Sequence, residues 1–314
     1  MSKRPRLFAG YFLEWIETYK VGAIRDISVS KYYIAHKHLT EICPDLTIDK
    51  LDRKAYQNIL NEYALTHERQ TTMDFHHQIG SCVRDMYHEG LIKRDPTYKA
   101  IIKGIPPRPK KKKFLQKGEL QKLLKSLELG EGINMDWFIL LVAKTGMRFA
   151  EAIALTPADF DWTRNTVSIN KTLNYKNSTM FFQDTKNKSS VRTISIDWQI
   201  VGQFKPLIEN LPQDELIFVN RDEPTGKYKR IFNSTYNSHL IRKCKESGIT
   251  VITMHGLRHT HASILLADGV STHSIAKRLG HSSVTTTQET YMHIIDELQS
   301  KDDEKILGAL MQLS

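Results

Sequence analysis

Residues 104–113 read Gly-Ile-Pro-Pro-Arg-Pro-Lys-Lys-Lys-Lys and separate two parts of the sequence that differ in character. The three prolines stop any helix, because proline lacks a backbone N–H and its ring clashes with the preceding turn. The lysines repel one another and keep the segment extended. We therefore expect two domains, residues 1–105 and 114–314, joined by a basic linker over 106–113, and a length of 314 residues agrees with that number.

The part before the linker has the apolar spacing of helices almost throughout. An aromatic and aliphatic stripe runs over residues 7–19, and we interpret it as the buried face of a helix. Similar patterns cover residues 32–39, 51–63 and 71–89, and Gly90 stands where a helix commonly ends. The sequence predicts a small bundle of four or five helices.

The part after the linker changes its period twice. Helical patterns cover residues 119–127 and 137–143, and helical character returns from residue 233. Between them, apolar and polar residues alternate around 167–169, over 180–183 and over 191–196, which predicts three short strands in one small antiparallel sheet. The expected fold is mainly α with a small antiparallel β-sheet, a helical domain followed by a mixed α/β domain.

Charge gives the first indication of a partner. The chain has a net charge of +10, and residues 1–113 hold 21 Lys and Arg against 13 Asp and Glu, whereas residues 114–314 hold 24 against 22. An excess near one end favours a polyanion such as DNA, although an ordinary basic protein fits the charge alone equally well.

Several classes of protein are disfavoured by composition. No apolar run reaches the 18 residues or so of a membrane span, and no apolar segment follows the basic start as in a signal peptide. Cys43, Cys82 and Cys244 are far apart and in no metal-ligand spacing. We expect a cytoplasmic protein without a disulfide framework or a membrane partner.

Three short segments and one tyrosine carry the chemistry. Residues 145–151 read Thr-Gly-Met-Arg-Phe-Ala-Glu, residues 255–261 read His-Gly-Leu-Arg-His-Thr-His, residues 279–283 read Leu-Gly-His-Ser-Ser, and Tyr291 follows ten residues after His281. Taken singly, each has an ordinary explanation. The histidine spacing could suit a metal, but a third ligand is not evident, and a lone tyrosine is usually part of a core.

Taken together, these residues suit attack on a phosphodiester. Such attack builds negative charge on the non-bridging oxygens, which arginine guanidinium groups match with two parallel donors. A tyrosine hydroxyl has a reference pKa of about 10, and nearby positive charge favours its ionised form. A covalent phosphotyrosine keeps the bond energy for rejoining, so neither a nucleotide cofactor nor a metal is expected.

The same segments resemble the motif boxes of the tyrosine recombinases, and the chain is most similar to integrases of phages and conjugative transposons of Gram-positive bacteria. The resemblance is specific over residues 145–151 and 253–293 and weak over 1–105. It implies a helical core-binding domain and a catalytic domain that together clamp double-stranded DNA at core recombination sites. The implied function is a site-specific recombinase that integrates and excises a mobile element through a 3′-phosphotyrosyl intermediate.

The resemblance also implies a role for each motif residue. Arg148 and Arg258 would bind the scissile phosphate, and His281 would donate a hydrogen bond to it. His255 would assist acid–base chemistry around the tyrosine, and Tyr291 would attack.

Further residues have supporting roles in this scheme. A lysine between the second and third predicted strands would protonate the leaving 5′-oxygen; Lys186 aligns best, and Lys188 is its competitor, because Thr185 and Asn187 depart from the family pattern. Glu151 would orient Arg148 or is a helix-surface carboxylate, and His259 would give support.

The linker lysines allow two interpretations. They form a solvated connection, or they lie along the DNA backbone together with Lys188. The residues concerned are Lys110, Lys111, Lys112 and Lys113.

Assembly and partners follow from the resemblance as well. The tail over residues 294–313 either packs on its own domain or docks on a neighbouring protomer, and we expect the latter, giving a homotetramer on DNA. An excisionase or a host DNA-bending factor would be an accessory partner. We find no room for an N-terminal arm-binding domain before residue 7.

Three alternative functions remain at this point. A Xer-like resolvase of chromosome dimers shares the chemistry, and so does a type IB topoisomerase. A DNA-binding regulator without catalysis belongs to a different class, and the complete set of motif residues disfavours it.

Overall fold

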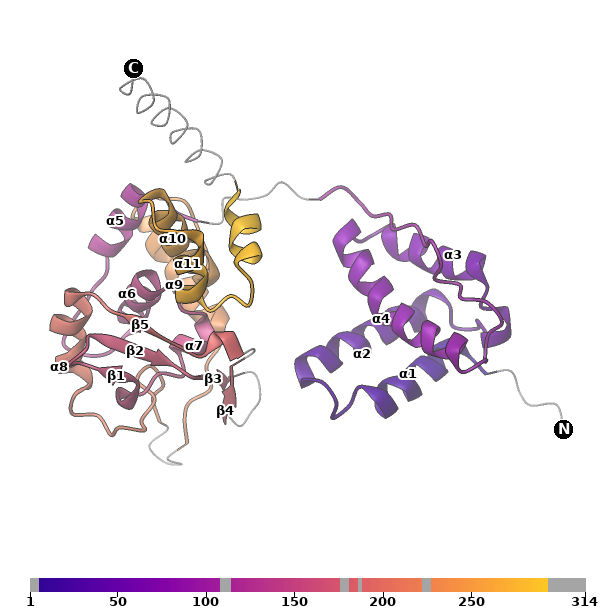
Figure 1. Cartoon of the computed structure of the whole chain (residues 1–314), viewed down its shortest axis with the longest axis horizontal. Coiled ribbons are helices and arrows are strands. Elements are labelled where there is room, and N and C mark those ends of the chain that lie inside the picture. Colours follow the sequence, from indigo (N-terminus) through magenta and orange to yellow (C-terminus); the bar gives the residue numbers. More distant parts are fainter. Residues whose placement is uncertain (1–5, 108–113, 176–180, 186–187, 222–226, 293–314) are drawn as a thin grey trace, which may run out of the picture. The chain divides into compact units, whose positions relative to one another are not determined.

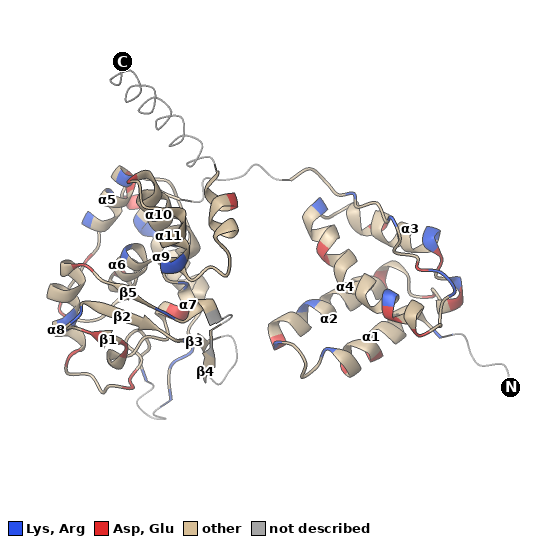
Figure 2. Ribbon diagram, in the orientation of Figure 1, with Lys and Arg blue, Asp and Glu red and all other residues tan. Residues whose placement is uncertain are grey.

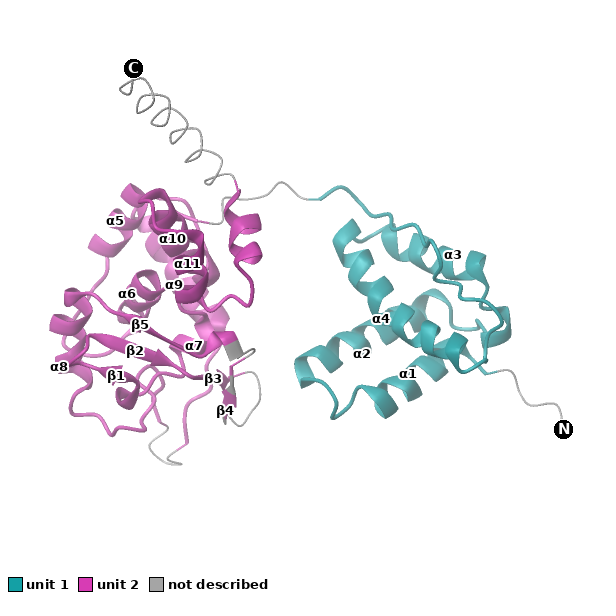
Figure 3. Ribbon diagram, in the orientation of Figure 1, with its two compact units in different colours: residues 1–110 teal, residues 111–314 magenta. Residues whose placement is uncertain are grey.

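The computed structural model describes residues 6–107, 114–175, 181–185, 188–221 and 227–292. Between residues 110 and 111, inside the stretch predicted to be a linker, the chain divides into two units (Figure 3). Both units are largely helical, and the strands lie in the second (Figure 1). The predicted fold class, mainly α with small antiparallel sheet structure, is confirmed.

Unit 1 is a bundle of helices, as its apolar spacing predicts. Its elements are α1 (Phe8–Tyr19), α2 (Asp26–Ile42), a 3-10 turn (Ile48–Lys50), α3 (Arg53–Ala64) and α4 (Arg69–His88). The aromatic stripe of α1 is buried, with Phe12 and Trp15 in the core. Trp15 also donates its indole N–H to Asp85 on α4 at 2.8 Å, which satisfies the one polar atom of this core side chain. Gly90 follows α4 with a φ of 74°, the left-handed conformation expected after a helix.

A segment after α4 runs back along the bundle and ties it together. Ile101 exchanges both its backbone groups with the amide of Gln57 at 2.9 Å. A Cβ on Gly104 would lie 2.2 Å from the backbone nitrogen of Arg69, so the chain can approach the start of α4 this closely only with glycine.

Unit 2 packs helices around the strands. Its α-helices within the described residues are α5 (Lys117–Lys125), α6 (Met135–Thr145), α7 (Phe149–Ala152), α8 (Lys205–Ile208), α9 (Asn233–Glu246), α10 (Met254–Ala267) and α11 (Thr272–Leu279), and a further helix covers residues 284–292. The apolar α6 lies in the middle of this core, and its most extensive helix contacts are with α10. This places the C-terminal end of α6, where the first motif begins, beside the helix that carries the second motif.

The strands pair differently from the prediction. Instead of one sheet, β1 (Phe160–Asp161), β2 (Thr166–Ile169) and β5 (Arg192–Ser195) form one antiparallel sheet, while β3 (Lys171–Asn174) and β4 (Phe181–Asp184) form a second. The expected single sheet of three strands is therefore wrong. β4 pairs with the strand directly before it, which costs less loop-closure entropy than pairing with β2. The alternation of β3 is weak because Leu173 is its one apolar residue, and the sequence reading missed it for that reason.

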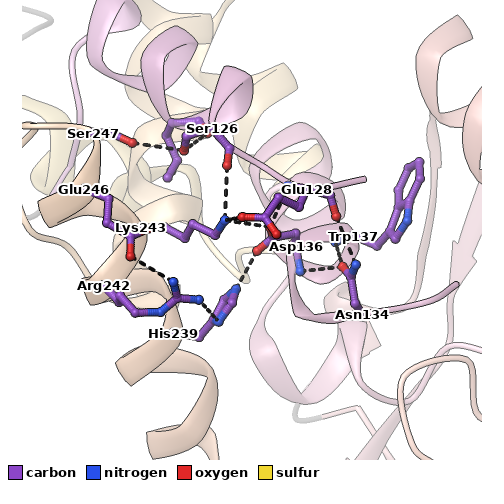
Figure 4. Close-up of polar contacts among 11 residues, drawn as sticks. Ser126, Glu128, Asn134, Asp136, Trp137, His239, Arg242, Lys243, Glu246 and Ser247 are labelled. Carbon is purple, nitrogen blue, oxygen red and sulfur yellow. Dashed lines mark hydrogen bonds and ion pairs between the residues drawn. The ribbon is translucent and has the colours of Figure 1, made fainter. Parts of the chain in front are cut away.

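An ionic network with a buried Lys243–Asp136 pair and an exposed Glu128 fixes the N-terminal end of α6 (Figure 4). Lys243 on α9 is buried and lies 2.8 Å from a Glu128 carboxylate oxygen and 3.1 Å from Asp136, the second residue of α6. His239, one turn earlier on α9, bonds the other oxygen of Asp136. Burial opposes ionisation of Asp136, but hydrogen bonds from His239, the Glu128 backbone and Lys243 outweigh it, so its pKa is lowered. α6 is thus held to α9 at one end and bears the motif turn at the other.

Charged side chains of both signs are interspersed over the described parts of both units (Figure 2). Of the helices in the described ranges, none combines the length and the apolar character needed to cross a bilayer.

The close approach at Gly104 gives a stability prediction. We expect Gly104→Ala to destabilise unit 1 by about 1–3 kcal/mol, because the new methyl group overlaps the backbone of α4. Gly10→Ala is the matched control: Gly10 lies inside α1 with open space around its Cβ position, so this variant should be neutral or stabilising by up to about 1 kcal/mol. Native-state hydrogen exchange of the α4 amides measures both effects. Equal exchange in wild type and Gly104→Ala would show that the approach is not tight.

Candidate active site

Arg148 follows the turn at the end of α6, where the backbone conformation is fixed by Gly146. Gly146 caps α6 with a φ of 68°, and a Cβ there would lie 2.7 Å from His261 and 2.8 Å from Leu279 side-chain atoms. Glycine is needed both for the left-handed conformation and for the packing. Two residues later Arg148 begins α7 as its N-cap.

The end of α11 is closed by a Schellman motif. Gly280 has a φ of 69°, and its N–H donates to Lys277, while the N–H of His281 donates to Ala276 at 3.0 Å. These bonds satisfy two of the carbonyl groups that every helix leaves free at its C-terminus. His281 is fixed by its own backbone bond directly beyond the helix end.

Three arginines donate hydrogen bonds to the next three carbonyl groups of this helix end. They come from three different elements: Arg148 from the turn after α6, Arg192 from β5 and Arg258 from α10. The negative end of the α11 dipole favours such cations. The carbonyl of Arg278 accepts from Arg192 Nε at 2.6 Å, that of Leu279 from Arg258 Nη2 at 2.7 Å, and that of Gly280 from Arg148 Nη2 at 3.2 Å. We call Arg148, Arg192 and Arg258 the arginine cluster.

Glu151 links two members of the arginine cluster. Its carboxylate accepts from Arg148 Nη1 at 2.7 Å and from Arg192 Nη2 at 2.9 Å, and it also accepts the backbone N–H of Arg148 at 2.9 Å. The side chain is 1% exposed, so it is not a helix-surface carboxylate. Burial would raise its pKa, but the hydrogen bond and charge of Arg192 and the charge of Arg148 lower it. Two of the three guanidinium groups bond this carboxylate, so the arginine cluster sets three positive charges against one negative charge.

The positive charge of the arginine cluster contributes to the lowered pKa values of Arg258 and His281. Burial and the charge of Arg148 lower the pKa of Arg258 to about 9. Burial and the charges of Arg258 and Arg148 lower the pKa of His281 to about 4, so its imidazole is neutral at pH 7. His281 Nδ1 lies 2.7 Å from the hydroxyl of Thr287, so when that hydroxyl donates, the proton of the ring is on Nε2.

Tyr291 lies in the helix over residues 284–292 with its ring packed among apolar side chains of α10 and α11. Its hydroxyl is 2.9 Å from His259 Nδ1. Burial raises the pKa of Tyr291 to about 12, and the charge of Arg258 opposes this rise. His255 stands edge-on to His259 with 4.6 Å between ring centroids and is itself exposed. The structure therefore places His259 in contact with the tyrosine.

The predicted site residues divide into those that the structure places and those outside its described residues. Unit 2 brings together Arg148, Glu151, His255, Arg258, His259, His281 and Tyr291. Lys188 begins a 3-10 turn, Lys188–Ser190, and its side chain is not among those described. Lys186, the linker lysines Lys110, Lys111, Lys112 and Lys113, and the tail over residues 293–314 lie outside the described residues.

Sequence reasoning assigned no role to Arg192, although a signal was available. In β5, residues 192 and 194 lie on the same face, and Ile194 is buried. An arginine on the core-facing side of a strand must have partners for its charge.

Comparison with known proteins agrees with this architecture. The family model described as the phage integrase family matches residues 113–297. The ICEBs1 integrase of Bacillus subtilis is 25% identical over 284 residues, 87% of this chain and 70% of that protein. The integrase of Staphylococcus phage L54a is 26% identical over 291 residues, 83% of this chain and 81% of that protein. A structure of the Tn1549 transposon integrase in complex with transposon right end DNA superposes with a TM-score of 0.73 at 17% identity, covering 95% of this chain and 99% of that one.

The chain belongs to the phage integrase family. It is a tyrosine site-specific recombinase, as the resemblance of its motifs predicted.

The buried His261 gives a prediction about pH. Its Nδ1 lies 3.0 Å from the Ala143 carbonyl and its Nε2 accepts from Arg278 at 2.9 Å, an arrangement that holds the neutral ring. Burial and the charge of Arg278 lower its pKa from 6.5 to about 4. Between these values the unfolded chain binds a proton that the folded chain does not, so the stabilisation is complete above pH 6.5 and is lost as the pH falls towards 4.

We expect wild type to lose roughly 3 kcal/mol more stability than His261→Gln between pH 7 and pH 4. Glutamine can donate and accept in the same places but does not titrate in this range. Thermal denaturation across this pH range measures the difference. Parallel curves for the two proteins would mean that His261 takes up its proton equally in both states.

Proposed function

We propose that this recombinase cleaves and rejoins DNA at specific sites with Tyr291 as its nucleophile, and that it integrates and excises a mobile genetic element. The observation that carries the proposal is the convergence of Arg148, Arg258 and His281 on the end of α11, in the same unit as the tyrosine. Fixed positive charge in a partly buried site stabilises a group whose negative charge increases during the reaction, as that of a phosphate under attack does.

Arg148 and Arg258 hold the scissile phosphate in this scheme. Each uses part of its guanidinium on backbone carbonyls, which fixes its orientation: Arg258 donates to Gly146 at 2.8 Å and to Leu279 at 2.7 Å. Preorganised donors of this kind need no rearrangement as charge develops on the non-bridging oxygens. Neutral His281 adds a hydrogen bond through the Nε2 proton.

The covalent step exchanges one phosphoester bond for another. Tyr291 Oη forms a bond to phosphorus, the bond to the 5′-oxygen breaks, and a 3′-phosphotyrosyl link and a free 5′-hydroxyl result. The phenolic proton passes to His259, which is in contact, with His255 beside it as the exposed partner. Lys186, with Lys188 as its competitor, gives a proton to the departing 5′-oxygen. Rejoining is the reverse reaction with another 5′-hydroxyl, so no nucleotide is consumed.

Double-stranded DNA is the substrate in this proposal. The Tn1549 relative was solved with transposon end DNA, and the ICEBs1 and phage relatives are integrases of mobile elements. We propose that residues 1–105 bind the core site on one side and that Lys110, Lys111, Lys112 and Lys113 contact its backbone. The tail over residues 294–313 would dock on a neighbouring protomer and close a tetramer. An excisionase or a host DNA-bending factor would set direction, and the reaction would take place at the nucleoid in the cytoplasm.

The nucleophile is tested by covalent trapping on a nicked suicide duplex of the element's own end. Wild type should give a slow-migrating adduct on a denaturing gel in EDTA, and Tyr291→Phe should give none, since it lacks the attacking oxygen. DNA binding by Tyr291→Phe should stay within about threefold of wild type, because the hydroxyl contacts His259 and is otherwise buried. An adduct with Tyr291→Phe, or loss of binding as complete as the loss of chemistry, would contradict the assignment.

The general acid is tested by replacing the leaving oxygen. Lys186→Ala should slow cleavage by about 10²–10⁴-fold, and a 5′-bridging sulfur should restore the rate, because a thiolate leaves without protonation. Lys188→Ala is the matched control two residues away and should cleave both substrates nearly as wild type does. If Lys188→Ala alone is rescued by sulfur, the assignment moves to Lys188.

A further inference from the structure

Arg192 bonds the same end of α11 as the two arginines that are proposed to bind the phosphate. It begins β5, pairs with Ile169 across the sheet, and its side chain is 5% exposed. All three nitrogens of its guanidinium already donate to protein acceptors, so Arg192 would have to give up a bond to hold a DNA phosphate. Any effect of Arg192 on the reaction must therefore act through the residues that it holds.

The guanidinium of Arg192 joins three separate segments. Its Nε donates to the Arg278 carbonyl at 2.6 Å, at the end of α11, and its Nη1 donates to the Ser190 carbonyl at 2.9 Å. Nη1 and Nη2 together face the two carboxylate oxygens of Glu151 at 3.3 Å and 2.9 Å. This fork-to-fork geometry is specific to arginine, since lysine has a single charged atom.

The pairing with Glu151 determines how Arg148 is presented. The same carboxylate holds Arg148 by its Nη1 and by its backbone N–H. With Arg192 present, the negative charge of Glu151 is shared between two guanidinium groups. Without Arg192, the buried carboxylate of Glu151 would pair with Arg148 alone. It would then neutralise more of the positive charge of Arg148, and Arg148 would attract a phosphate less strongly.

The contact with Ser190 fixes the end of a second segment. The connection between β4 and β5, residues 185–191, carries both candidate general acids, Lys186 and Lys188, and Ser190 lies one residue before its end. A Cβ on Gly280 would lie 2.9 Å from Arg192 Nη1 and 3.1 Å from the Cα of Ser190. The end of the lysine-bearing connection is therefore packed directly on the end of α11, and Arg192 makes the bonds there.

We propose that Arg192 is a positioning residue for the recombination reaction: it divides the charge of Glu151 so that Arg148 faces the scissile phosphate, and it holds Ser190 on the end of α11. This inference rests on the proposed function, because it takes Arg148 as a phosphate-binding group.

The test compares Arg192→Gln with wild type in the full chain, by the rate of covalent adduct formation. Two suicide duplexes are used, one with the natural phosphate and one with a methylphosphonate at the scissile position, which lacks the negative charge. Arg278→Gln is the matched control: Arg278 is a partly buried arginine, and it donates to His261 and to the Ser195 and Lys144 carbonyls but not to Glu151. Arg192→Lys keeps the charge without the fork and replaces Arg192→Gln if that variant does not fold.

We expect Arg192→Gln to be roughly 100-fold slower than wild type on phosphate, and the deficit to shrink below about tenfold on methylphosphonate. Arg192→Lys should show a smaller deficit of the same pattern. Arg278→Gln should show the same relative rate on both substrates, even where its thermal stability falls.

Three results would overturn the inference. Wild-type rates for Arg192→Gln on phosphate would leave the proposed function intact and remove the role of Arg192. Equal deficits of Arg192→Gln on both substrates, matching Arg278→Gln, would assign Arg192 to the fold alone. No adduct with wild type, on DNA that it binds, would overturn the proposed function together with this inference.

Discussion

The arrangement of the site depends on the C-terminal end of α11. Five successive carbonyl groups there, residues 276–280, all have donors: the first two bond the backbone of a Schellman motif, and the next three bond Arg192, Arg258 and Arg148. A helix end needs partners for its free carbonyls, and guanidinium groups are strong donors with the favourable charge. Three elements far apart in sequence are thereby brought to one point, with His281 directly after it.

Placing three arginines close together in a largely buried site costs free energy, because like charges repel and burial removes their water. Glu151 and the negative end of a helix dipole offset part of the repulsion, while burial and the remaining repulsion lower the pKa values of Arg258 and His281. The opposite shift of Tyr291 keeps its hydroxyl protonated at neutral pH. A bound anion would bring the pKa values of Arg258 and His281 back towards their ordinary values. The excess of positive charge thus favours an anion, as the proposed phosphate site requires.

Much of this could be predicted from the sequence, and the exceptions have physical causes. The helices of unit 1 follow from apolar periodicity, and the motif residues from the chemistry that they share. The pairing of β4 with β3 was missed because Leu173 alone marks β3 as half buried. Arg192 was missed because its partners are backbone carbonyls and a glutamate 41 residues away, which no local pattern displays. The contact of His259 with Tyr291 depends on how the helix over residues 284–292 returns to α10, which spacing alone does not determine.

We propose, as the centre of this mechanism, that the arginine cluster stabilises the phosphate that Tyr291 attacks. Its most direct test is to trap the covalent adduct, digest the DNA and the protein, and locate the nucleotide by mass spectrometry of the peptides. The account predicts one modified peptide, with the nucleotide linked through its 3′-phosphate to Tyr291. A nucleotide on another residue, or a link through a 5′-phosphate, would contradict it.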